Sequence, residues 1–348
     1  MGPSPLERDA VKTKTIFITG ILIPFMAAPI ICGASGEDPE KPTIIVVVGA
    51  AGSPEYGAQF AQWADLWQEA CDKAGATFMP IGFDNVGEPN DRTTLQNTLS
   101  RESQQNPAAL WLVLIGHGTF DGRTAKFNLR GPDVSADDLS EWLEATIRPL
   151  VIINTASSSA PFLNKLSTEG RVVITATKSG YEQNYTRFGQ YLAEAMAHPQ
   201  ADLDKDGQTS LLESFLAASK RTNEFYSAAG RLVTEHALLD DNGDGLGTRA
   251  DWFRGVRPVQ KAEGGASLDG YRAHQYHLVP SEVENKMPPQ LRAVRDRLEL
   301  EVVKLRDAKE DFSEEDYYTK LEKLLVEIAH IYEQTDTPEG ELNADNYR

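Results

Sequence analysis

The stretch Ala109-Leu110-Trp111-Leu112-Val113-Leu114-Ile115-Gly116-His117-Gly118 is an apolar run that ends in a histidine between two glycines. A second apolar run, Leu150-Val151-Ile152-Ile153, ends in Asn154-Thr155-Ala156-Ser157-Ser158-Ser159. Short apolar runs bounded by glycine and polar residues are typical of buried strands in a parallel sheet. Functional groups of such sheets lie beyond the carboxyl ends of the strands. We therefore expect His117 and Ser157 to be neighbours in space.

The rest of residues 43–200 continues an alternation of strands and helices. Thr43 to Gly49 is β-branched on both faces, which indicates a central strand. Further strands are expected at 76–83 and 171–177, and helices at 56–74, 91–105, 135–146 and 188–197. This order predicts an α/β fold, a three-layer α/β/α sandwich around a mainly parallel sheet. Neither of the common nucleotide-binding glycine patterns is present after the first strand, so no cofactor is expected there.

The His-Gly after one strand and the Ala-Ser-Ser-Ser-Ala after another resemble the legumain and caspase superfamily of cysteine peptidases. The resemblance to the legumain-like branch spans roughly Thr43 to Ala197. In that superfamily the His-Gly supplies the base, and an Ala-Cys-x-Ser-Gly supplies the nucleophile. On this pattern Ala156 matches the alanine, Ser157 the catalytic cysteine, Ser159 the serine and Ala160 the glycine. The resemblance implies a caspase-hemoglobinase-like fold in which the nucleophilic thiol is missing.

Three functions are consistent with this pattern. A hydroxyl is a weaker nucleophile than a thiolate and needs a base oriented by a third group, for which the sequence offers no obvious candidate. The first hypothesis is therefore a catalytically silent peptidase homologue that binds calcium and presents an interaction surface, with a peptide or protein as the expected ligand at the His117 and Ser157 site. The second is an active hydrolase in which Ser157 attacks, His117 moves the proton, and backbone amides near Gly118 hold the oxyanion. The third is a calcium-dependent binding or scaffold protein.

The overall charge excludes some partners. The 348-residue chain carries 34 Lys and Arg against 52 Asp and Glu, a formal net charge of −18, and no basic stretch relieves it. Double-stranded nucleic acid and anionic membrane surfaces both need a local cationic face, so we expect neither as a partner. Cations are the expected ligands.

Residues 1–34 have the order of a secretory signal peptide. Lys12 and Lys14 precede an uncharged stretch, and Cys32-Gly33-Ala34 fits a cleavage site. We expect an exported protein whose mature chain begins near Ser35, with 35–42 as a linker. The alternative is an uncleaved membrane anchor, because the stretch is just long enough to span a bilayer. After cleavage Cys71 is the sole cysteine, which excludes an intramolecular disulfide and favours a buried structural thiol.

Residues 201–255 contain two acidic loops that resemble EF-hand calcium loops, with helices expected around them. The first, Asp202 to Glu213, fits the pattern D-x-D-x-D-G-x5-E at every ligand position. The expected cofactor is Ca²⁺, and the alternative is a polar turn that caps a helix. The expected ligands are Asp202, Asp204, Asp206, the carbonyl of Gln208, Ser210 through water, and bidentate Glu213.

The second acidic loop, Asp240 to Asp251, keeps the turn glycine but ends in the shorter aspartate. A polar turn is the alternative here as well. Thr209 and Gly247 stand at the eighth positions, where paired EF-hands carry an apolar residue, so the two loops are expected to be separate sites. The expected ligands of the second loop are Asp240, Asn242, Asp244, Leu246, Thr248 and Asp251.

The carboxyl-terminal part changes from an irregular connection to helices. Residues 256–289 show no clear period, and His274 and His277 within them are expected to be surface or core histidines rather than a metal pair. Two apolar stripes predict an antiparallel helical hairpin at 290–334, packed on the α/β domain or presented to a partner protein. Residues 335–348 are expected to be disordered.

Overall fold

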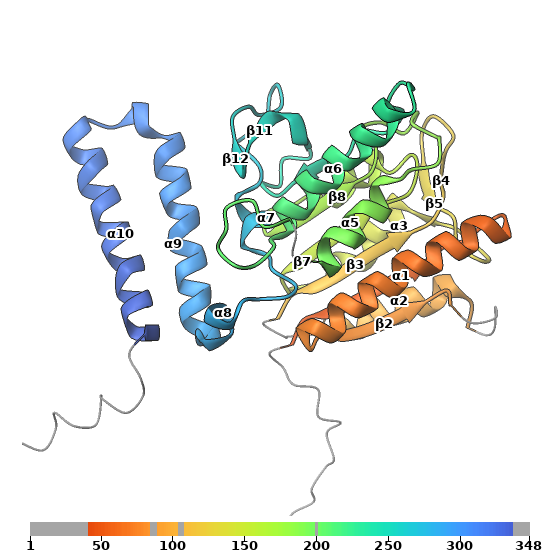
Figure 1. The fold of residues 1–348 in the computed structure, drawn as a ribbon, viewed down its shortest axis with the longest axis horizontal. Coiled ribbons are helices and arrows are strands. Elements are labelled where there is room, and N and C mark those ends of the chain that lie inside the picture. The colour runs from red at the N-terminus through yellow and green to blue at the C-terminus, as the bar shows by residue number, and fades with distance from the viewer. Residues whose placement is uncertain (1–40, 84–88, 104–107, 199–200, 337–348) are drawn as a thin grey trace, which may run out of the picture. The chain divides into compact units, whose positions relative to one another are not determined.

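A mainly parallel sheet runs through the protein (Figure 1). The computed structural model describes residues 41–83, 89–103, 108–198 and 201–336, and within them this sheet has seven strands in the order β10-β9-β8-β7-β3-β1-β2. Neighbouring strands from β2 to β8 pair in parallel, whereas β9 and β10 are antiparallel additions at one edge. The strands are β1 (Thr43–Val48), β2 (Thr77–Ile81), β3 (Leu110–Ile115), β7 (Leu150–Asn154), β8 (Arg171–Thr175), β9 (Leu238–Asp240) and β10 (Thr248–Arg249).

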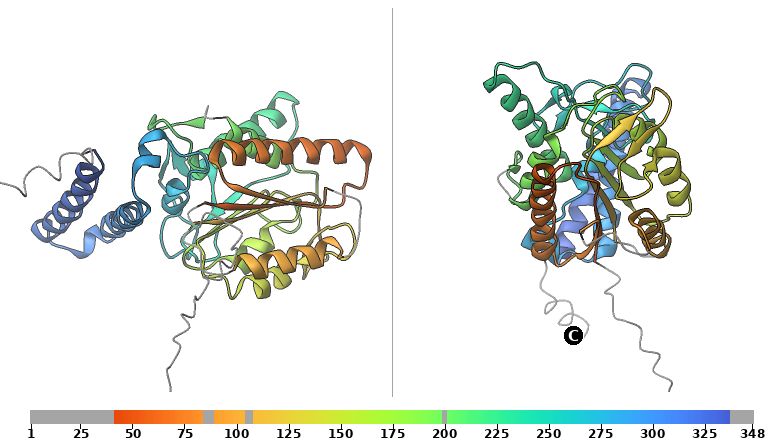
Figure 2. Two further views of the ribbon diagram at one scale, coloured as in Figure 1. Left: turned by 90° about the horizontal axis from the view of Figure 1, so that it is seen from below. Right: turned by 90° about the vertical axis from the view of Figure 1, so that its right-hand side faces the viewer.

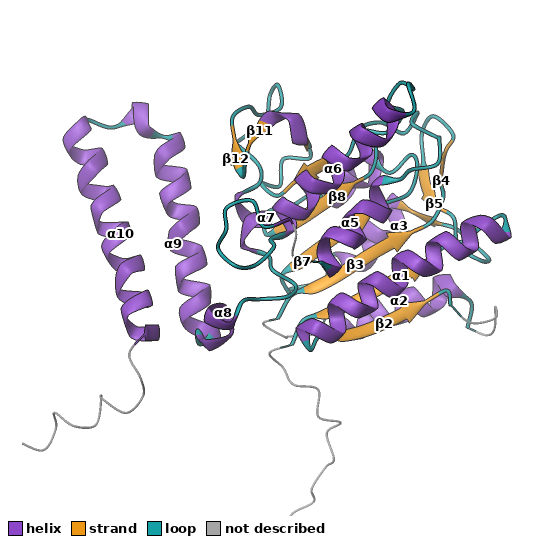
Figure 3. Ribbon diagram, in the orientation of Figure 1, coloured by secondary structure: helices purple, strands orange, loops and turns teal. Residues whose placement is uncertain are grey.

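Helices cover both faces of this sheet, which confirms the predicted α/β fold with three layers (Figures 2 and 3). Alternate residues of β1 point to opposite faces, so Ile44 and Val46 belong to one core and Ile45 and Val47 to the other. The first core is closed by α1 (Pro54–Ala74), α5 (Phe188–Ala197) and α6 (Leu211–Ala228). The second is closed by α2 (Asp91–Glu102), α3 (Ala136–Leu143) and α4 (Ala160–Leu166).

Capping residues fix where several helices begin and end. Ser53 accepts a hydrogen bond from the Tyr56 amide at the start of α1, and Gly75 closes that helix at φ 62°. Ser135 and Asp138 form a reciprocal capping box at the start of α3. These local signals explain why the observed helix limits lie close to those predicted from the sequence.

A small antiparallel sheet begins directly after His117. It consists of β4 (Gly118–Phe120), β5 (Ala125–Phe127) and β6 (Val134–Ser135). Gly118 is the first residue of β4 and pairs with Phe127, whose ring is fully buried. The backbone at Gly118 is therefore held by this small sheet, directly after the end of β3.

The region after α6 differs from the prediction in two respects. Helices were expected around both acidic loops, but the second loop begins at the last residue of β9, contains β10 and ends within the short helix η2 (Ala250–Trp252). Residues 256–289 were expected to be irregular, yet they contain short elements. These are β12 (Arg257–Pro258), which pairs with β11 (Phe253–Arg254), and the helices α7 (Tyr271–Gln275) and α8 (Glu282–Lys286).

The predicted helical hairpin is confirmed. Helix α9 (Pro289–Asp307) is followed by η3 (Lys309–Asp311) and α10 (Glu314–Asp336), and the two long helices share an apolar cluster that includes Met287, Leu298 and Ile331. The side-chain amide of Gln275 in α7 donates to the Asp296 carbonyl at 2.8 Å, so α9 contacts α7. In the described ranges no helix combines the length and the apolar character needed to cross a membrane. The predicted signal peptide and linker before residue 41, and the predicted tail from 337 onward, lie outside those ranges.

Candidate active site and calcium loops

The ends of β3 and β7 meet at one edge of the sheet. The two strands pair in parallel, with Leu114 opposite Asn154. The amide and the hydroxyl of Thr155 both donate to the Leu114 carbonyl, at 3.0 and 2.8 Å, which ties the two strand ends together. The structure thus brings the segment at His117 and Gly118 against the segment at Ser157, as the sequence predicts.

The Ser157 hydroxyl is bonded to the main chain of Gly118. Ser157 Oγ donates to the Gly118 carbonyl at 3.1 Å, and the Gly118 amide donates to Ser157 Oγ at 3.2 Å. Ser157 is only 5% exposed. Residue 118 has to be glycine for this approach, because a Cβ there would lie 2.1 Å from the Ser157 carbonyl oxygen. The candidate nucleophile, Ser157 Oγ, and the candidate oxyanion donor, the Gly118 amide, are therefore hydrogen-bonded to each other.

The His117 ring is oriented by a main-chain carbonyl and by aromatic side chains. Its Nε2 lies 3.1 Å from the Ala51 carbonyl oxygen. Because a carbonyl only accepts, this bond requires the proton to be on Nε2 and leaves Nδ1 as the basic nitrogen of the neutral ring. The edges or faces of Tyr56, Phe60 and Tyr185 pack around the imidazole at centroid distances of 4.9, 5.2 and 6.1 Å.

Ala51 is therefore the orienting third group that the sequence did not reveal. It lies in the loop after β1, and β1 pairs with β3, so its carbonyl reaches the same edge of the sheet. Every residue has a main-chain carbonyl, so the residue type at position 51 gives no signal. The position of this loop directly after the central strand is the sequence feature that could have indicated the role of Ala51. Burial raises the pKa of the neighbouring Tyr185 hydroxyl above its ordinary value.

The segment after β8 is fixed by Glu182. The Glu182 carbonyl accepts from the Ser158 amide at 2.8 Å, and its carboxylate accepts from the Lys178 amide at 2.9 Å. The same carboxylate bonds His236 Nδ1. Ser158 itself has φ 55° and is buried, an uncommon conformation for a residue that is not glycine. Glu182 and His236 were not singled out from the sequence, since they are far apart along the chain.

The first acidic loop connects the end of α5 to α6 and is closed by Glu213. This residue is 1% exposed, and its carboxylate accepts from the Leu203 and Asp204 amides at one oxygen and from the Ser210 amide and hydroxyl at the other. Asp202, Asp204 and Asp206 have carboxylate oxygens within 4.8 Å of one another. The structure therefore brings together the acidic side chains that the sequence predicts for this site.

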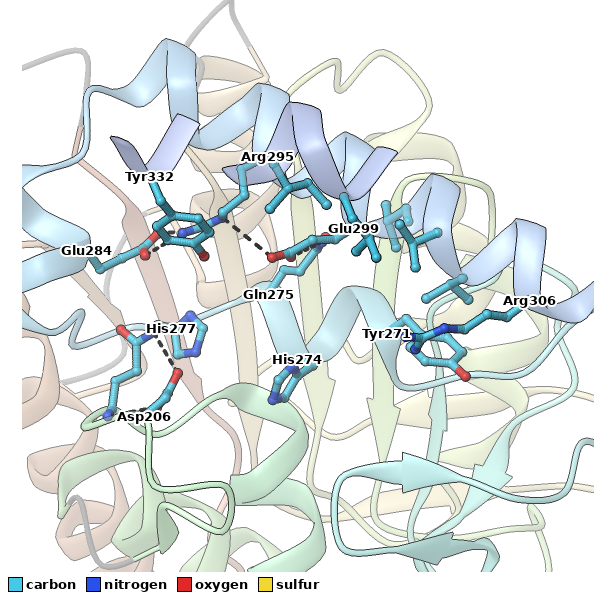
Figure 4. A pocket seen from close by; sticks show the side chains of 16 residues that line it. Asp206, Tyr271, His274, Gln275, His277, Glu284, Arg295, Glu299, Arg306 and Tyr332 are labelled. Carbon is cyan, nitrogen blue, oxygen red and sulfur yellow. Dashed lines mark hydrogen bonds and ion pairs between the residues drawn. The ribbon is translucent and has the colours of Figure 1, made fainter. Parts of the chain in front are cut away.

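His274 also reaches the first loop. Its Nε2 is 2.9 Å from Asp204 Oδ2, and it forms a compact group with Asp204 and Glu213. We expected His274 to be an ordinary surface or core histidine, because the sequence separates it from the loop. His274, His277 and Gln275 also line a pocket between the first loop and the helices α9 and α10 (Figure 4).

The second acidic loop is buried more deeply than the first. Asp240 and Asp269 are each 1% exposed, and Thr248 is fully buried. Burial raises the pKa of the Asp240 carboxyl, and the charge of Asp244 raises it further. Burial also raises the pKa of Asp269 to about 8, with the charges of Asp241 and Asp240 adding to the effect. These carboxylates therefore lie close enough to repel one another.

Asp251, the predicted last ligand of the second loop, has a different environment. Its side chain is 59% exposed and pairs with the Arg249 guanidinium at 2.7 Å. The remaining predicted positions of that loop, Asn242, Asp244 and Leu246, are linked by hydrogen bonds from the Asp244 and Leu246 amides to the preceding side-chain oxygens. Asp269, which was not predicted as a ligand, also bonds to this loop, because its carboxylate accepts from the Asp241 and Asn242 amides.

Comparisons with known proteins give matches at the level of structure. No protein-family model matches the chain, and no curated protein matches it in sequence. The solved structures similar to it include the initiator caspase Dronc from Drosophila, at 17% identity and a TM-score of 0.39, over 60% of this chain and 83% of that one. They also include caspase-1 from Spodoptera frugiperda, at 10% identity and a TM-score of 0.39, over 59% of this chain and 87% of that one.

Proposed function

We propose that the protein is an exported, catalytically silent homologue of the legumain and caspase peptidases, stabilised by calcium, that binds a peptide or protein at the His117 and Ser157 site. The sequence pattern at these residues supports the relationship. The place of the site beyond β3 and β7 supports a binding role. A partner protein at the helical hairpin stays a prediction.

One observation carries the silent interpretation: the proton of the Ser157 hydroxyl is donated to the Gly118 carbonyl. A serine becomes a nucleophile when a general base accepts this proton, and a carbonyl is not a base of that kind. The Gly118 amide, which would hold an oxyanion, is bonded to the same hydroxyl. A thiol at this position has a much lower pKa than a hydroxyl, so it would ionise far more easily without a general base.

One observation favours the second candidate, an active hydrolase. The Ala51 carbonyl supplies an orienting partner for His117 and leaves Nδ1 as the base. A serine nucleophile needs an oriented base to take its proton, and a thiol depends less on such a base. In this function Ser157 would have to turn away from Gly118 and donate its proton to His117.

An activity-based probe experiment separates the two candidates. Wild type, Ser157→Ala and Ser157→Cys are treated with a serine-directed fluorophosphonate and with a thiol-directed peptidyl acyloxymethyl ketone. The silent function predicts no fluorophosphonate labelling of wild type and new ketone labelling of Ser157→Cys, which His117→Ala in the same protein abolishes. Fluorophosphonate labelling of wild type that is lost in Ser157→Ala would instead establish the hydrolase.

Two controls make the labelling specific. All variants carry Cys71→Ala, so that the native thiol of α1 contributes no signal. Ser219→Cys provides a matched thiol, because Ser219 is 8% exposed in α6, close to the 5% of Ser157, and lies outside the site. Equal labelling of Ser219→Cys and Ser157→Cys would mean that the probe reports an accessible thiol rather than an intact site.

Calcium and export are separate parts of the proposal. The acidic side chains gathered at Asp202 to Glu213 support a calcium role, since carboxylate and carbonyl oxygens are the ligands that this ion prefers. The order of residues 1–34 supports export. Mass spectrometry of the protein from an extracytoplasmic fraction is expected to find an amino terminus near Ser35. An intact amino terminus in soluble cytoplasm would contradict it.

A further inference from the structure

The two acidic loops share one internal hydrogen-bonding pattern. In the first loop, side chains at the first, third and fifth positions accept from the amides of Lys205, Asp206 and Gln208. In the second loop, the corresponding side chains accept from the amides of Gly243, Asp244 and Leu246. Because the pattern is the same position by position, the residue that closes the first loop can be sought at the equivalent place in the second.

Three donors identify the place of the closing carboxylate in the first loop. One oxygen of Glu213 accepts from the amides of the second and third loop residues, Leu203 and Asp204. The other oxygen accepts from the hydroxyl of the ninth residue, Ser210, at 2.8 Å. This is the carboxylate that binds calcium through both oxygens in loops of this pattern.

In the second loop the same three donors bind Asp269. The amides of the second and third residues, Asp241 and Asn242, donate to Asp269 Oδ1 at 3.0 and 3.3 Å. The hydroxyl of the ninth residue, Thr248, donates to Asp269 Oδ2. Asp269 therefore takes the place that Glu213 has in the first loop, although it comes from a separate segment of the chain.

The segment before Asp269 also holds the loop. The Ala266 amide donates to Asp244 Oδ2 at 2.8 Å. The Asn242 side-chain amide donates to the Ser267 carbonyl at 2.9 Å, so Oδ1 of Asn242 is the oxygen that remains on the loop side. Residues 266–269 thus close the second loop where an EF-hand would use its second helix.

A buried carboxylate oxygen of this arrangement has no hydrogen-bond partner among the described residues, which makes it a donor for a cation. Asp240 is 1% exposed, and its Oδ1 accepts from Ser167 Oγ and from the Gly243 amide. Its Oδ2 is buried without a hydrogen-bond partner among the residues that the structure describes. A buried carboxylate oxygen without a partner is costly, and a bound cation removes that cost.

We propose that the second loop is a calcium site whose closing ligand is Asp269 rather than Asp251. The expected ligands are the carboxylates of Asp240, Asp244 and Asp269, the Asn242 side-chain oxygen and the Leu246 carbonyl. These are hard oxygen donors, which suit a divalent calcium ion. This inference extends the proposed calcium role from the first loop to a second, separately closed site.

The test counts bound calcium in the full chain. Wild type, Asp269→Asn, Asp251→Asn and Glu213→Gln are dialysed against millimolar calcium, and bound metal is measured by elemental analysis. We expect two equivalents in wild type and in Asp251→Asn, and one in Asp269→Asn and in Glu213→Gln. Asp251→Asn is the matched control, because it removes the same charge from the position that the sequence motif names.

The outcomes distinguish this inference from the proposed calcium role. Loss of one equivalent in Asp251→Asn with two retained in Asp269→Asn would overturn the inference. A single equivalent in wild type that only Glu213→Gln removes would leave the first loop as a calcium site and also overturn the inference. No bound calcium in wild type would refute both proposals.

A second variant keeps the test valid if Asp269→Asn fails to fold. Asp240→Asn removes the charge of the unpartnered oxygen and keeps one oxygen to accept from Gly243 and Ser167. Circular dichroism and gel filtration first establish that each variant is folded. Loss of one equivalent in Asp240→Asn, with two retained in Asp251→Asn, supports closure by Asp269, and retention of two in Asp240→Asn overturns it.

Discussion

Replacement of Glu213 by glutamine tests the calcium role most directly, because the structure separates its two effects on stability. The carboxylate accepts four hydrogen bonds from Leu203, Asp204 and Ser210. Glutamine retains one acceptor oxygen and therefore loses two bonds to a charged group. At about 1.5–3 kcal/mol for each such bond, Glu213→Gln lowers the free energy of unfolding by about 3–6 kcal/mol in chelator.

Calcium widens this difference. Wild type gains about 2.7 kcal/mol from the first loop when calcium is a hundredfold above Kd, and the variant does not. The difference between the two proteins therefore rises to roughly 6–9 kcal/mol in calcium. A contribution from the second loop cancels, since both proteins retain it. With an unfolding entropy of about 2.1 cal/mol/K per residue over about 300 residues, the calcium increment corresponds to about 4 °C in Tm.

The assay is urea unfolding followed by circular dichroism, in calcium and in chelator. Asp251→Asn is the control, because its exposed pair with Arg249 contributes under about 1 kcal/mol and is expected to respond to calcium as wild type does. An identical difference between wild type and Glu213→Gln in calcium and in chelator would refute the reasoning. In that case the loop would be a polar cap of α6 and nothing more.

Three further predictions concern the core, the site and acid stability. Burial raises the pKa of the Cys71 thiol to about 12, so iodoacetamide at pH 8 is expected to label this thiol only in urea. Rapid labelling of the native protein would contradict the burial of Cys71. Gly118→Ala is expected to lower Tm because its Cβ would clash with backbone. The matched change Gly57→Ala in α1, where the nearest atom is 3.5 Å from the added Cβ, is expected to raise the free energy of unfolding by about 0.5–1 kcal/mol, and equal shifts would refute the steric argument. The Arg92 guanidinium lowers the pKa of Asp138, so this pair stabilises the fold above the unfolded pKa of about 3.9 and the stability is lost as pH falls. Urea unfolding between pH 2.5 and 6 should therefore show a flatter acid limb for Asp138→Asn, and an unchanged slope would oppose this.

Much of the fold could be predicted from the sequence because its signals are local. The apolar runs of β3 and β7 are buried on both faces, and the capping residues Ser53 and Ser135 stand where their helices begin. The contact between Gly118, which follows His117, and Ser157 agrees with the rule about the carboxyl ends of parallel strands. Strand β9 was not predicted, since Leu238–Asp240 is short and its last residue is the first of the predicted second acidic loop.

The candidate site contains partners that no local pattern reveals. The Ala51 carbonyl is a main-chain group, and the Ser157 to Gly118 hydrogen bonds depend on rotamer and backbone position. Asp269 follows the start of the second loop by 29 residues and is joined to it only by folding. A motif that is read along the chain assigns the closing position to Asp251, because it has no means of recognising a ligand from a distant segment.

Strand β8 links the second loop to the candidate site. On one side it pairs with β9, where Val173 lies opposite Asp240, and the Ser167 hydroxyl before it donates to the Asp240 carboxylate. Beyond its other end, the Thr177 amide donates to Ser159 Oγ, two residues after Ser157. In the proposed calcium-bound protein, a cation that neutralises Asp240 would therefore stabilise the strand that anchors the serine segment. Because this anchoring does not depend on a reactive nucleophile, the proposed binding function would still need it.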